Sequence, residues 1–408
     1  MSGDYETPFN WRKNVYVLAF ASSCTAASYT MLVPFLPLYL LELGAPEKRV
    51  ALYSGAVFSV AFLVAAIMAP VWGKMADQRG KKLMAVRACA GLTIAYFLGG
   101  LVTSPLQLFG MRVVQGFANG FLPMVLAIAS ASAPPDRLGY ALGIAQTGQI
   151  IGGVLGPLIG GVIAELIGMR LSFFVASGFL LLVTLMVLLL VKEPAASQPA
   201  ASARPKKMDG SIMDDFRYAL SNRHIMGMLI LSFIISLANM VLQPVISLYV
   251  AALQHSMENV VFTSGLVFSL GGIAGAISTA PWGNFGQRHG YFRVMALAFL
   301  GAGVFNFLQY FPTTISGFAI CQFFFGLFFV GANPAVSAIL VQYSPENFRG
   351  RVFGLATTAN QSGAMVGPLI GSLISTYFGI RDVFLVTGPV LFCIGLWLWQ
   401  KRERRRIQ

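Results

Sequence analysis

Apolar segments of about 20 residues, long enough for a helix to cross the hydrocarbon core of a bilayer, recur along the whole chain. The alternating pattern of a β-barrel strand is absent, so the segments are predicted to be helices, which bond every backbone group internally. The first segment is too long for the core of a signal peptide and has no evident cleavage site, so we expect it to be retained. The twelve expected spans are 14–41, 50–72, 83–102, 106–129, 140–165, 170–191, 224–250, 261–282, 291–311, 315–341, 351–376 and 382–400.

The fifth span carries glycine at every fourth position, at Gly152, Gly156 and Gly160. On a helix these residues form one smooth stripe. In a bilayer such a stripe lets a second helix approach backbone to backbone, because lipid supplies no hydrophobic drive for helix association. Pro157 lacks a backbone donor and is expected to bend the helix.

The second half of the chain repeats the first at an offset of 210 or 211 residues. The stripe returns as Gly354, Gly363, Gly367, Pro368 and Gly371, Pro34, Leu38 and Tyr39 return as Pro244, Leu248 and Tyr249, and Ser54-Gly55 returns as Ser264-Gly265. We therefore predict an all-α membrane protein with 12 transmembrane helices in two pseudo-symmetric six-helix bundles. A parallel repeat of this kind is related by an axis along the membrane normal.

The expected domains are an N-terminal bundle at 1–191, a linker at 192–222 and a C-terminal bundle with a basic tail at 223–408. The linker begins with the flexible stretch PAASQPAASARP. Ser211 is predicted to cap a short helix that rests on the membrane surface. The apolar face of that helix would consist of Ile212, Phe216, Ala219 and Leu220.

The composition is 56% hydrophobic and 11% charged, which is typical of a membrane protein. The net charge of +13 would suit a nucleic-acid binder, but the distribution of cations indicates otherwise. When alternate loops are assigned to two sides, one side collects 23 of the 28 Lys and Arg residues, five of them at 74–87 and five after residue 400. This positive-inside pattern predicts that both termini face the cytoplasm. The basic tail is expected on anionic headgroups.

Three further stretches carry a family resemblance. They are Gly73-KMA-Asp77-QR-Gly80-Lys81-Lys82 after the second span, Leu108-FGM-Arg112-VV-Gln115-Gly116 in the fourth, and Pro34-FL-Pro37 in the first. Together with the glycine stripe they resemble the motifs of the major facilitator superfamily, and more narrowly those of its twelve-helix drug:proton antiporters. The opening Thr7-Pro8-Phe9-Asn10-Trp11-Arg12-Lys13-Asn14 resembles the start of MdtG-type multidrug exporters.

The resemblance implies roles for each motif. It implies an antiporter motif at Gly143, Gly152, Gly156, Pro157, Gly160 and Gly161, a conformational latch at Gly73, Asp77, Arg79, Gly80 and Lys81, and proton coupling at Arg112, Gln115 and Gly116. It also implies that the fifth helix packs on the eighth and the second on the eleventh. We expect the glycine stripes, and the small-residue faces at Ala61, Ala65 and Ala69 and at Gly271 and Gly275, to form these contacts between the halves.

The stretch after the second span is expected to form a very short hairpin, with Gly73 and Gly80 at its turns. Asp77 is its only acid, and it could face the positive N-terminus of the eleventh helix and so latch the halves. The alternative is a solvated turn whose lysines only determine topology. Family members usually have a base directly after the aspartate, where this chain has Gln78. The second copy, around Gly283, lacks the acid, so only the first half is expected to latch.

Arg112 is expected to be the only charged residue well inside a span. Burying it costs about 2.5–3.5 kcal/mol on insertion scales, so such residues are functional by default. The alternative is structural, with the side chain extending to the nearer end of its helix. We favour a role in a polar cavity that also contains Gln115, Asn119, Gln146 and Gln149. The repeat partner of Arg112 is Gln322, so the charge is asymmetric.

A substrate cavity is expected between the halves, walled by Phe and Met, which suit varied apolar ligands. The substrate-binding candidates are Ser28, Tyr29, Asn119, Gln146, Gln149, Asn239, Gln243, Asn333, Asn360 and Gln361. For most of these residues the alternative is ordinary helix packing. Every acid falls in a loop or at a helix end, so no proton carrier is visible within a span; Asp77 and Arg112 are the candidates.

These features predict a secondary active transporter that exports drugs or other small amphiphiles, and the family resemblance implies exchange for protons. No nucleotide-binding motif is present, and no span has the side chains of an intramembrane enzyme, so we predict neither a cofactor nor a catalytic or metal site. Cys24, Cys89, Cys321 and Cys393 lack metal or redox spacing and are expected to be packing residues. The alternatives are an importer or facilitator of a small metabolite and a polytopic membrane sensor. The expected partners are substrate, protons and lipid but no nucleic acid, and the resemblance implies a monomer in a bacterial inner membrane.

Overall fold

The computed structural model describes residues 10–134, 137–193, 217, 221–254, 259–344 and 349–406. Within these residues the side chains of 77, 349–351 and 401–406 are not described. Every regular element in the described part is a helix, as the apolar pattern predicts. The expected surface helix after Ser211 and the motif residues before Asn10 lie outside the described residues.

The first half-bundle comprises the first six predicted spans. They are α1 (Trp11–Thr30) with α2 (Leu36–Glu42), α3 (Val50–Arg79), α4 (Lys81–Leu101), α5 (Pro105–Ala118) with α6 (Phe121–Ser132), α7 (Leu138–Ile167) and α8 (Met169–Leu190). A short 3-10 helix, η1 (Glu47–Arg49), precedes α3.

The second half-bundle repeats this order. Its elements are α10 (Arg223–Val241) with α11 (Gln243–Gln254), α12 (Val260–His289), α13 (Tyr291–Leu308), α14 (Ile315–Phe329) with α15 (Ala332–Tyr343), α16 (Arg349–Tyr377) and α17 (Asp382–Arg406). All predicted spans therefore coincide with helices, and ten of the helical segments in the described part are long and apolar enough to cross a membrane. The segments 11–42 and 349–377 are helical but fall outside that set of ten.

The first, fourth, seventh and tenth spans are each interrupted near a proline. Proline has no N–H for the carbonyl four residues earlier, so the helical ladder loses a bond there. The prolines are Pro34 between α1 and α2, Pro123 in the first turn of α6, Pro244 in the first turn of α11, and Pro334 in the first turn of α15. Pro157 and Pro368 lie inside helices that continue without interruption.

The prediction of a hairpin from Gly73 is wrong. Helix α3 continues to Arg79, so Gly73 lies inside the helix, and the chain reverses at Gly80 alone. Gly80 has φ 95°, in the left-handed region that glycine adopts without steric cost. The apolar pattern ends at residue 72, but the backbone bonds of the helix extend beyond it.

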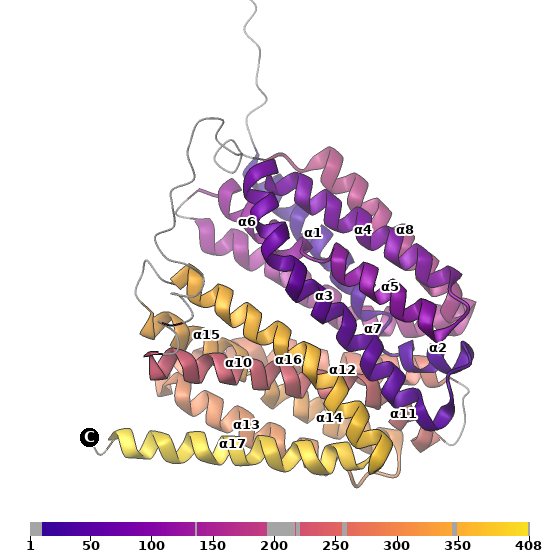
Figure 1. The fold of residues 1–408 in the computed structure, drawn as a ribbon. Coiled ribbons are helices and arrows are strands. Elements are labelled where there is room, and N and C mark those ends of the chain that lie inside the picture. The colour runs from indigo at the N-terminus through magenta and orange to yellow at the C-terminus, as the bar shows by residue number, and fades with distance from the viewer. Residues whose placement is uncertain are drawn as a thin grey trace, which may run out of the picture.

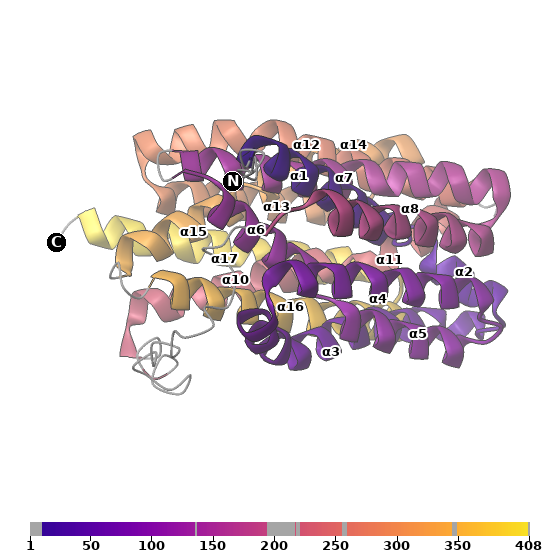
Figure 2. The same ribbon diagram turned by 90° about the horizontal axis from the view of Figure 1, so that it is seen from above.

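The two half-bundles meet mainly through two pairs of helices, α3 with α16 and α7 with α12, and α11 also contacts α2 and α3. This confirms the expected pairing of the second with the eleventh span and the fifth with the eighth. We call the end of the bundle that holds Asn10, Gly80 and Gly290 the terminal end, and the opposite end, which holds Gly44 and Gly168, the distal end. Figure 1 shows the half-bundles side by side. Helices α3 and α16 converge on the side of the view opposite the C-terminus, and Figure 2 shows the same arrangement from above.

Contacts between the halves are concentrated toward the distal end. There Gly55 lies against Ser372 and the Pro368 carbonyl, and Gly265 against the Pro157 carbonyl. Toward the terminal end of the same four helices, added methyl groups at four other glycines would meet nothing within 4 Å. Those glycines are Gly73, Gly143, Gly283 and Gly354. Among the described residues, the glycines of these four helices therefore bring the halves into close contact toward the distal end and not toward the terminal end.

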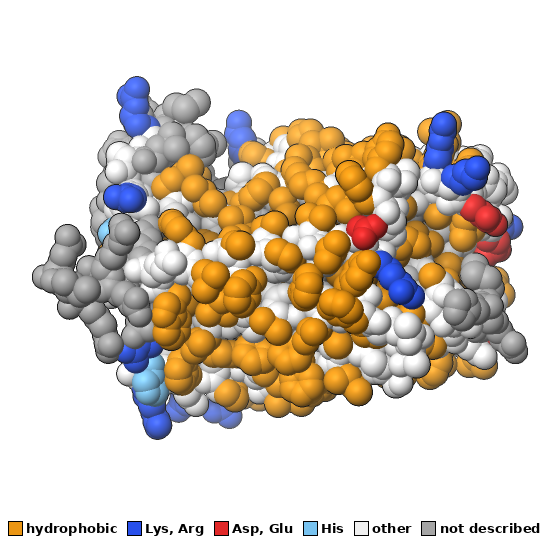
Figure 3. Space-filling model, turned by 90° about the horizontal axis from the view of Figure 1, so that it is seen from below, with side chains coloured by type: hydrophobic (Ala, Val, Ile, Leu, Met, Phe, Trp, Pro, Cys, Tyr) orange, Lys and Arg blue, Asp and Glu red, His pale blue; other side chains and the backbone are white. Residues whose placement is uncertain are grey.

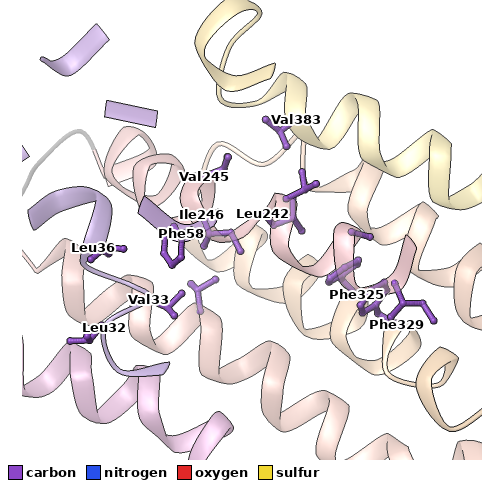
Figure 4. Close-up of a cluster of buried hydrophobic side chains, with 14 of the residues drawn as sticks. Leu32, Val33, Leu36, Phe58, Leu242, Val245, Ile246, Phe325, Phe329 and Val383 are labelled. Carbon is purple, nitrogen blue, oxygen red and sulfur yellow. The ribbon is translucent and has the colours of Figure 1, made fainter. Parts of the chain in front are cut away.

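The hydrophobic core shows the same difference between the two ends of the bundle. One cluster draws side chains from both halves, including Leu32 and Val33 beside the first break, Phe58 of α3, and Val245 and Ile246 of α11 (Figure 4). A second cluster contains only residues of the first half. On the outside, hydrophobic side chains form a broad band between two ends where charged side chains gather (Figure 3), as expected for a surface that faces lipid.

Candidate functional site

Arg112 is the centre of a buried polar cluster in the first half-bundle. Its side chain is 1% exposed. Its Nη1 donates to Gln115 Oε1 at 2.8 Å, and Gln115 Nε2 donates to the Tyr96 hydroxyl at 3.1 Å. The guanidinium lies over the Phe58 ring, 5.2 Å from its centroid. The side chain is thus held by groups from α3, α4 and α5 and does not extend to the end of its helix.

Some polar atoms of this cluster have no hydrogen-bond partner. Nε and Nη2 of Arg112 and the hydroxyl of Tyr29 are buried without a hydrogen-bond partner among the protein atoms. None of the buried charged or polar side chains in the described part is a carboxylate. An unpaired charge in a low-dielectric interior interacts strongly with any opposite charge that approaches. The unpaired donors of this cluster therefore favour the approach of an anion or of a neutral hydrogen-bond acceptor.

The second half-bundle has a neutral cluster at the equivalent place. Gln322, the repeat partner of Arg112, accepts through Oε1 a hydrogen bond of 2.9 Å from Gln309 Nε2. Nearby on the same helix as Gln309, Asn306 Oδ1 accepts one of 2.8 Å from the Thr387 hydroxyl. Asn306 is the repeat partner of Tyr96 at the offset of 210 residues. The asymmetry expected at Arg112 and Gln322 thus extends to their partners.

The glycine stripes lie elsewhere than predicted. Gly152, Gly156 and Gly160 pack against the backbone and side chains of α1, and Gly363, Gly367 and Gly371 against α10, so both stripes hold helices within one half. Of the antiporter motif, the contacts across to α12 come from Gly161, where an added methyl group would lie 3.1 Å from Phe262 Cα, and from the Pro157 carbonyl. Spacing alone shows that a stripe exists, but not which neighbour fills it.

The small-residue faces are also internal to the halves. Gly116 of α5 lies against the Ala61 carbonyl of α3, and Gly326 of α14 against Gly271 of α12, again at matching repeat positions. A methyl group added at Gly275 would lie 3.5 Å from Val330, a residue of the same half-bundle. The expectation that these faces join the halves is therefore wrong, although the helix pairs themselves are correct. Gly116 acts as a packing contact beside Arg112.

The latch residues are only partly described. The Asp77 side chain is outside the described part, and Arg79 is exposed. The backbone N–H groups of Lys81 and Lys82 donate to the Glu193 carboxylate at 2.8 and 3.1 Å. Sequence reading missed this carboxylate, which caps the N-terminus of α4, because it comes from beyond α8 and more than 100 residues away. A carboxylate at a helix N-terminus is favoured by the helix dipole.

Asn14 is a second residue whose contacts the sequence pattern did not predict. Its Nδ2 donates to Ser132 Oγ at 2.8 Å and to the Lys192 carbonyl at 2.9 Å, and its Oδ1 accepts from the Lys192 N–H at 3.0 Å. These bonds connect the starts and ends of α1, α6 and α8. Residues 192–193, assigned to the linker, are thus bonded to the first half-bundle.

A second arginine of the first half-bundle bonds to backbone carbonyls within the bundle. Arg87 lies six residues into α4, and its guanidinium reaches the break between α5 and α6. In the sequence it groups with the loop cations, because it follows Lys81 and Lys82 closely. A cysteine prediction needs correction, because Cys393 is exposed while Cys89 is buried.

The substrate-binding candidates have different environments. Asn119, Gln146, Asn239 and Asn333 are exposed, whereas Tyr29, Gln149, Gln243, Asn360 and Gln361 are half-buried. Ser28 is 2% exposed and contributes to packing. Asn119 Oδ1 accepts from the Gly120 N–H at 2.7 Å, which stabilises the break in the fourth span. In the described part, no group of three or more His, Cys, Asp or Glu side chains is placed to hold a metal ion.

Comparison with known proteins agrees with this architecture. The family model of the Major Facilitator Superfamily matches residues 18–281 and 228–408. The chain is 32% identical over 404 residues to the multidrug resistance protein MdtG of Escherichia coli strain SMS-3-5, covering 98% of this chain and 97% of the relative, and equally similar to MdtG of strain K12. Similar solved structures include the nucleoside transporter NupG, with 16% identity, a TM-score of 0.76 and coverage of 96% and 98%. Another is a bacterial homologue of the human lysosomal transporter Spinster, with 14% identity, a TM-score of 0.77 and coverage of 97% of each chain. The chain is a multi-pass membrane protein that belongs to the major facilitator superfamily.

Proposed function

We propose that this protein is a secondary active exporter of drugs or other small amphiphiles, driven by exchange with protons. The observation that carries the proposal is the similarity to a multidrug resistance protein over 98% of the chain. The similarity to NupG and to the Spinster homologue supports the fold alone and does not favour their substrates. The protein would not be an enzyme, because transport by a conformational change requires no covalent chemistry.

The contacts between the halves support transport by alternating access. Among the described residues, Gly55, Gly161 and Gly265 make close contacts between the half-bundles toward the distal end, whereas the glycines toward the terminal end of the same helices make none. If the basic loops and both termini face the cytoplasm of a bacterial inner membrane, this form would open to the cytoplasm. We propose that rocking of residues 1–191 against 223–408 then exposes the same site on the other side, within a single monomer.

Proton coupling is assigned to the cluster around Arg112. The unpartnered Nε and Nη2 atoms and the Tyr29 hydroxyl mark it as the strongest uncompensated electrostatic feature in the described spans. The polar candidates Asn119, Gln146, Asn239 and Asn333 are the most accessible of the proposed substrate-binding set. With a buried cation and no buried carboxylate in the described part, the interior favours neutral, zwitterionic or anionic compounds.

The test is proton release from everted membrane vesicles that contain the protein. Vesicles are acidified inside by respiration, and a panel of drugs and dyes is added while a pH-sensitive dye reports the internal pH. An antiporter exports protons as it accumulates drug, so the internal pH should rise for some compounds. Vesicles without the protein are the control. Substrate-driven uptake of a metabolite such as a nucleoside, with no proton release for any drug, would instead favour the importer.

A further inference from the structure

The break in the fourth span leaves backbone carbonyls without their helical donors. Helix α5 ends at Ala118, Asn119 is extended with ψ 164°, and Gly120 has φ 118°. In a continuous helix the Asn119 carbonyl would accept from residue 123, which is a proline without an N–H. The Phe117 carbonyl likewise loses its partner because α6 starts only at Phe121. Such carbonyls must find other donors within a membrane protein.

Three donors from the neighbouring helices satisfy these carbonyls. Trp72 Nε1 of α3 donates to the Phe117 carbonyl at 2.9 Å. Arg87 of α4 donates through Nη1 to the same carbonyl at 3.1 Å and through Nη2 to the Asn119 carbonyl at 3.0 Å. The Arg87 guanidinium also stacks on Trp72, with Cζ 3.9 Å from the ring centroid. A planar fork with several donors is suited to bridging two carbonyls in this way.

The second half-bundle shows the same break without the arginine. Trp282, the repeat partner of Trp72, donates to the Leu327 carbonyl at 2.8 Å. The repeat partner of Arg87 is Leu297. Here the interruption also spans two residues, Val330 and Gly331, but both are in right-handed helical conformation with φ −63° and −60°. The arginine is thus present where the break is open and absent where the two helices nearly continue.

Arg87 is also connected to the coupling cluster. Helix α5, which carries Arg112 and Gln115, is bonded to α4 at two places, by Tyr96 to Gln115 and by Arg87 to the carbonyls at its C-terminal end. Both links come from α4, which is one rigid helix. The Arg87 bonds therefore limit rotation of α5 about the bond between Tyr96 and Gln115. Loss of the second link would let α5 shift relative to α4 and change the place of the Arg112 guanidinium.

We propose that Arg87 is a positioning residue, which holds the fourth span in its broken form and thereby aligns Arg112 for proton coupling. The role in coupling depends on the proposed function, whereas the role in holding the break does not. Trp72 is the second component of this clamp. The tenth span has a leucine, Leu297, at the position equivalent to Arg87. By comparison, we expect a leucine at position 87 to favour a more continuous fourth span.

The first test measures the break without transport. In a variant with the four native cysteines replaced by serine, Asn119→Cys is labelled with a membrane-permeant maleimide. Asn119 is exposed, and its backbone is held by Arg87. Adding Arg87→Leu should change the labelling rate at least about fivefold, since fixed and relaxed backbones differ in local opening. Trp72→Phe, which keeps the ring but removes one donor, should change it less. An unchanged rate in both variants would overturn the clamp.

The second test measures coupling. Arg87→Leu should lower the maximal rate of proton-driven transport at least about tenfold, as expected for a displaced functional group, and should flatten its pH profile while the KM for substrate changes little. Arg87→Lys keeps one donor and should restore part of the rate. If the leucine variant does not accumulate in the membrane, the rate and pH profile of the lysine variant serve as the test. Arg293→Leu removes a cation from α13, the counterpart of α4, and serves as the control.

The two tests separate the possible failures. A wild-type protein that transports nothing would refute the proposed function, while the labelling test would still decide whether Arg87 holds the break. A normal pH profile in Arg87→Leu, with altered labelling, would refute the link to Arg112 and leave a purely structural clamp. Equal losses in Arg87→Leu and Arg293→Leu would show that charge in general, and not this contact, matters.

Discussion

The two half-bundles share their packing but differ in their polar interior. Tyr39 and Tyr249 occupy equivalent places and donate to the carbonyls of Gly99 and Gln309 at 3.3 and 3.2 Å. Beside these matched bonds, the first half has Arg112 with Gln115 and Tyr96, and the second has Gln322 with amide partners. Contacts that define the helix bundle have been kept in both copies, whereas the charged contacts are found in one.

This difference indicates a division of roles. A duplicated fold needs the same backbone approach and the same capping of carbonyls in each copy, because every helix must be satisfied within lipid. A buried guanidinium is costly and is retained only where it acts. The first half has the arginines Arg112 and Arg87, and the second half has the uncharged Gln322 and Leu297 at the equivalent positions.

The largest effect is expected from removing the charge in the first half. Arg112→Ala should lower proton-driven efflux to background, at least about a hundredfold by analogy with a misplaced catalytic group, with the protein still present in the membrane. Gln322→Ala should lower it only a few-fold, since a neutral hydrogen bond contributes about 1 kcal/mol. Efflux in everted vesicles at several pH values measures both. Arg112→Lys should be only partly active, because a point charge cannot reproduce the planar fork.

Normal pH-dependent efflux by Arg112→Ala would contradict the assignment of coupling to the first half. Equal losses in Arg112→Ala and Gln322→Ala would show that the two clusters have equivalent roles. Membrane levels of each variant, measured by immunoblotting, exclude the trivial explanation of poor insertion.

The next effect distinguishes contacts within a half from contacts between halves. Gly160 lies against the Met31 carbonyl of α1, whereas its neighbour Gly161 lies against α12. Gly160→Leu should reduce folding of the first half, seen as a lower midpoint of thermal unfolding in detergent and less protein in the membrane. Gly161→Leu should leave folding closer to normal but should prevent closure of the distal end and abolish transport.

Similar unfolding midpoints and similar transport in these two variants would show that the glycines only provide space for folding. Gly178→Leu on α8 is a suitable control, because a methyl group there would meet nothing within 4 Å. It should differ little from the wild type.

A moderate effect is expected from the charge of the substrate. Because the described interior contains a buried arginine and no buried carboxylate, a lipophilic dication should be exported less than an anion or neutral compound of matched size. A cation meets like charge in a low-dielectric interior, where the repulsion exceeds that in water. Vesicle uptake and cell resistance with matched pairs of compounds test this. Strong export of a dication without response to anions would refute the charge argument, though not the transporter assignment.

The smallest effect should be the same in both halves. Tyr39→Phe and Tyr249→Phe each remove a hydroxyl that donates to a buried carbonyl. Each should lower the free energy of unfolding by about 1 kcal/mol, with transport nearly unchanged, as measured by thermal unfolding of the purified protein. A large loss of transport in only one variant would show that the asymmetry of the halves extends to these tyrosines.

Sequence reading was most successful where a local property sufficed. Apolar length predicted the helices, because a span must cover the hydrocarbon core whatever its neighbours are. The offset of 210 or 211 residues predicted which positions correspond, and the matching contacts of Trp72 with those of Trp282, and of Gly116 with those of Gly326, confirm that correspondence. The assignment to the superfamily is also confirmed, since it follows from the motifs and their spacing.

What the sequence determined by itself is the set of helices, their duplication, the family and the presence of a charged residue that lipid would not tolerate. The tertiary structure alone decided which neighbour each face meets: the stripe at Gly156 packs on α1, Glu193 caps α4, and Arg87 holds the broken fourth helix. The physical reason is that helical periodicity specifies the direction of a side chain around its own axis. The partner at the end of that direction depends on how all the helices pack together.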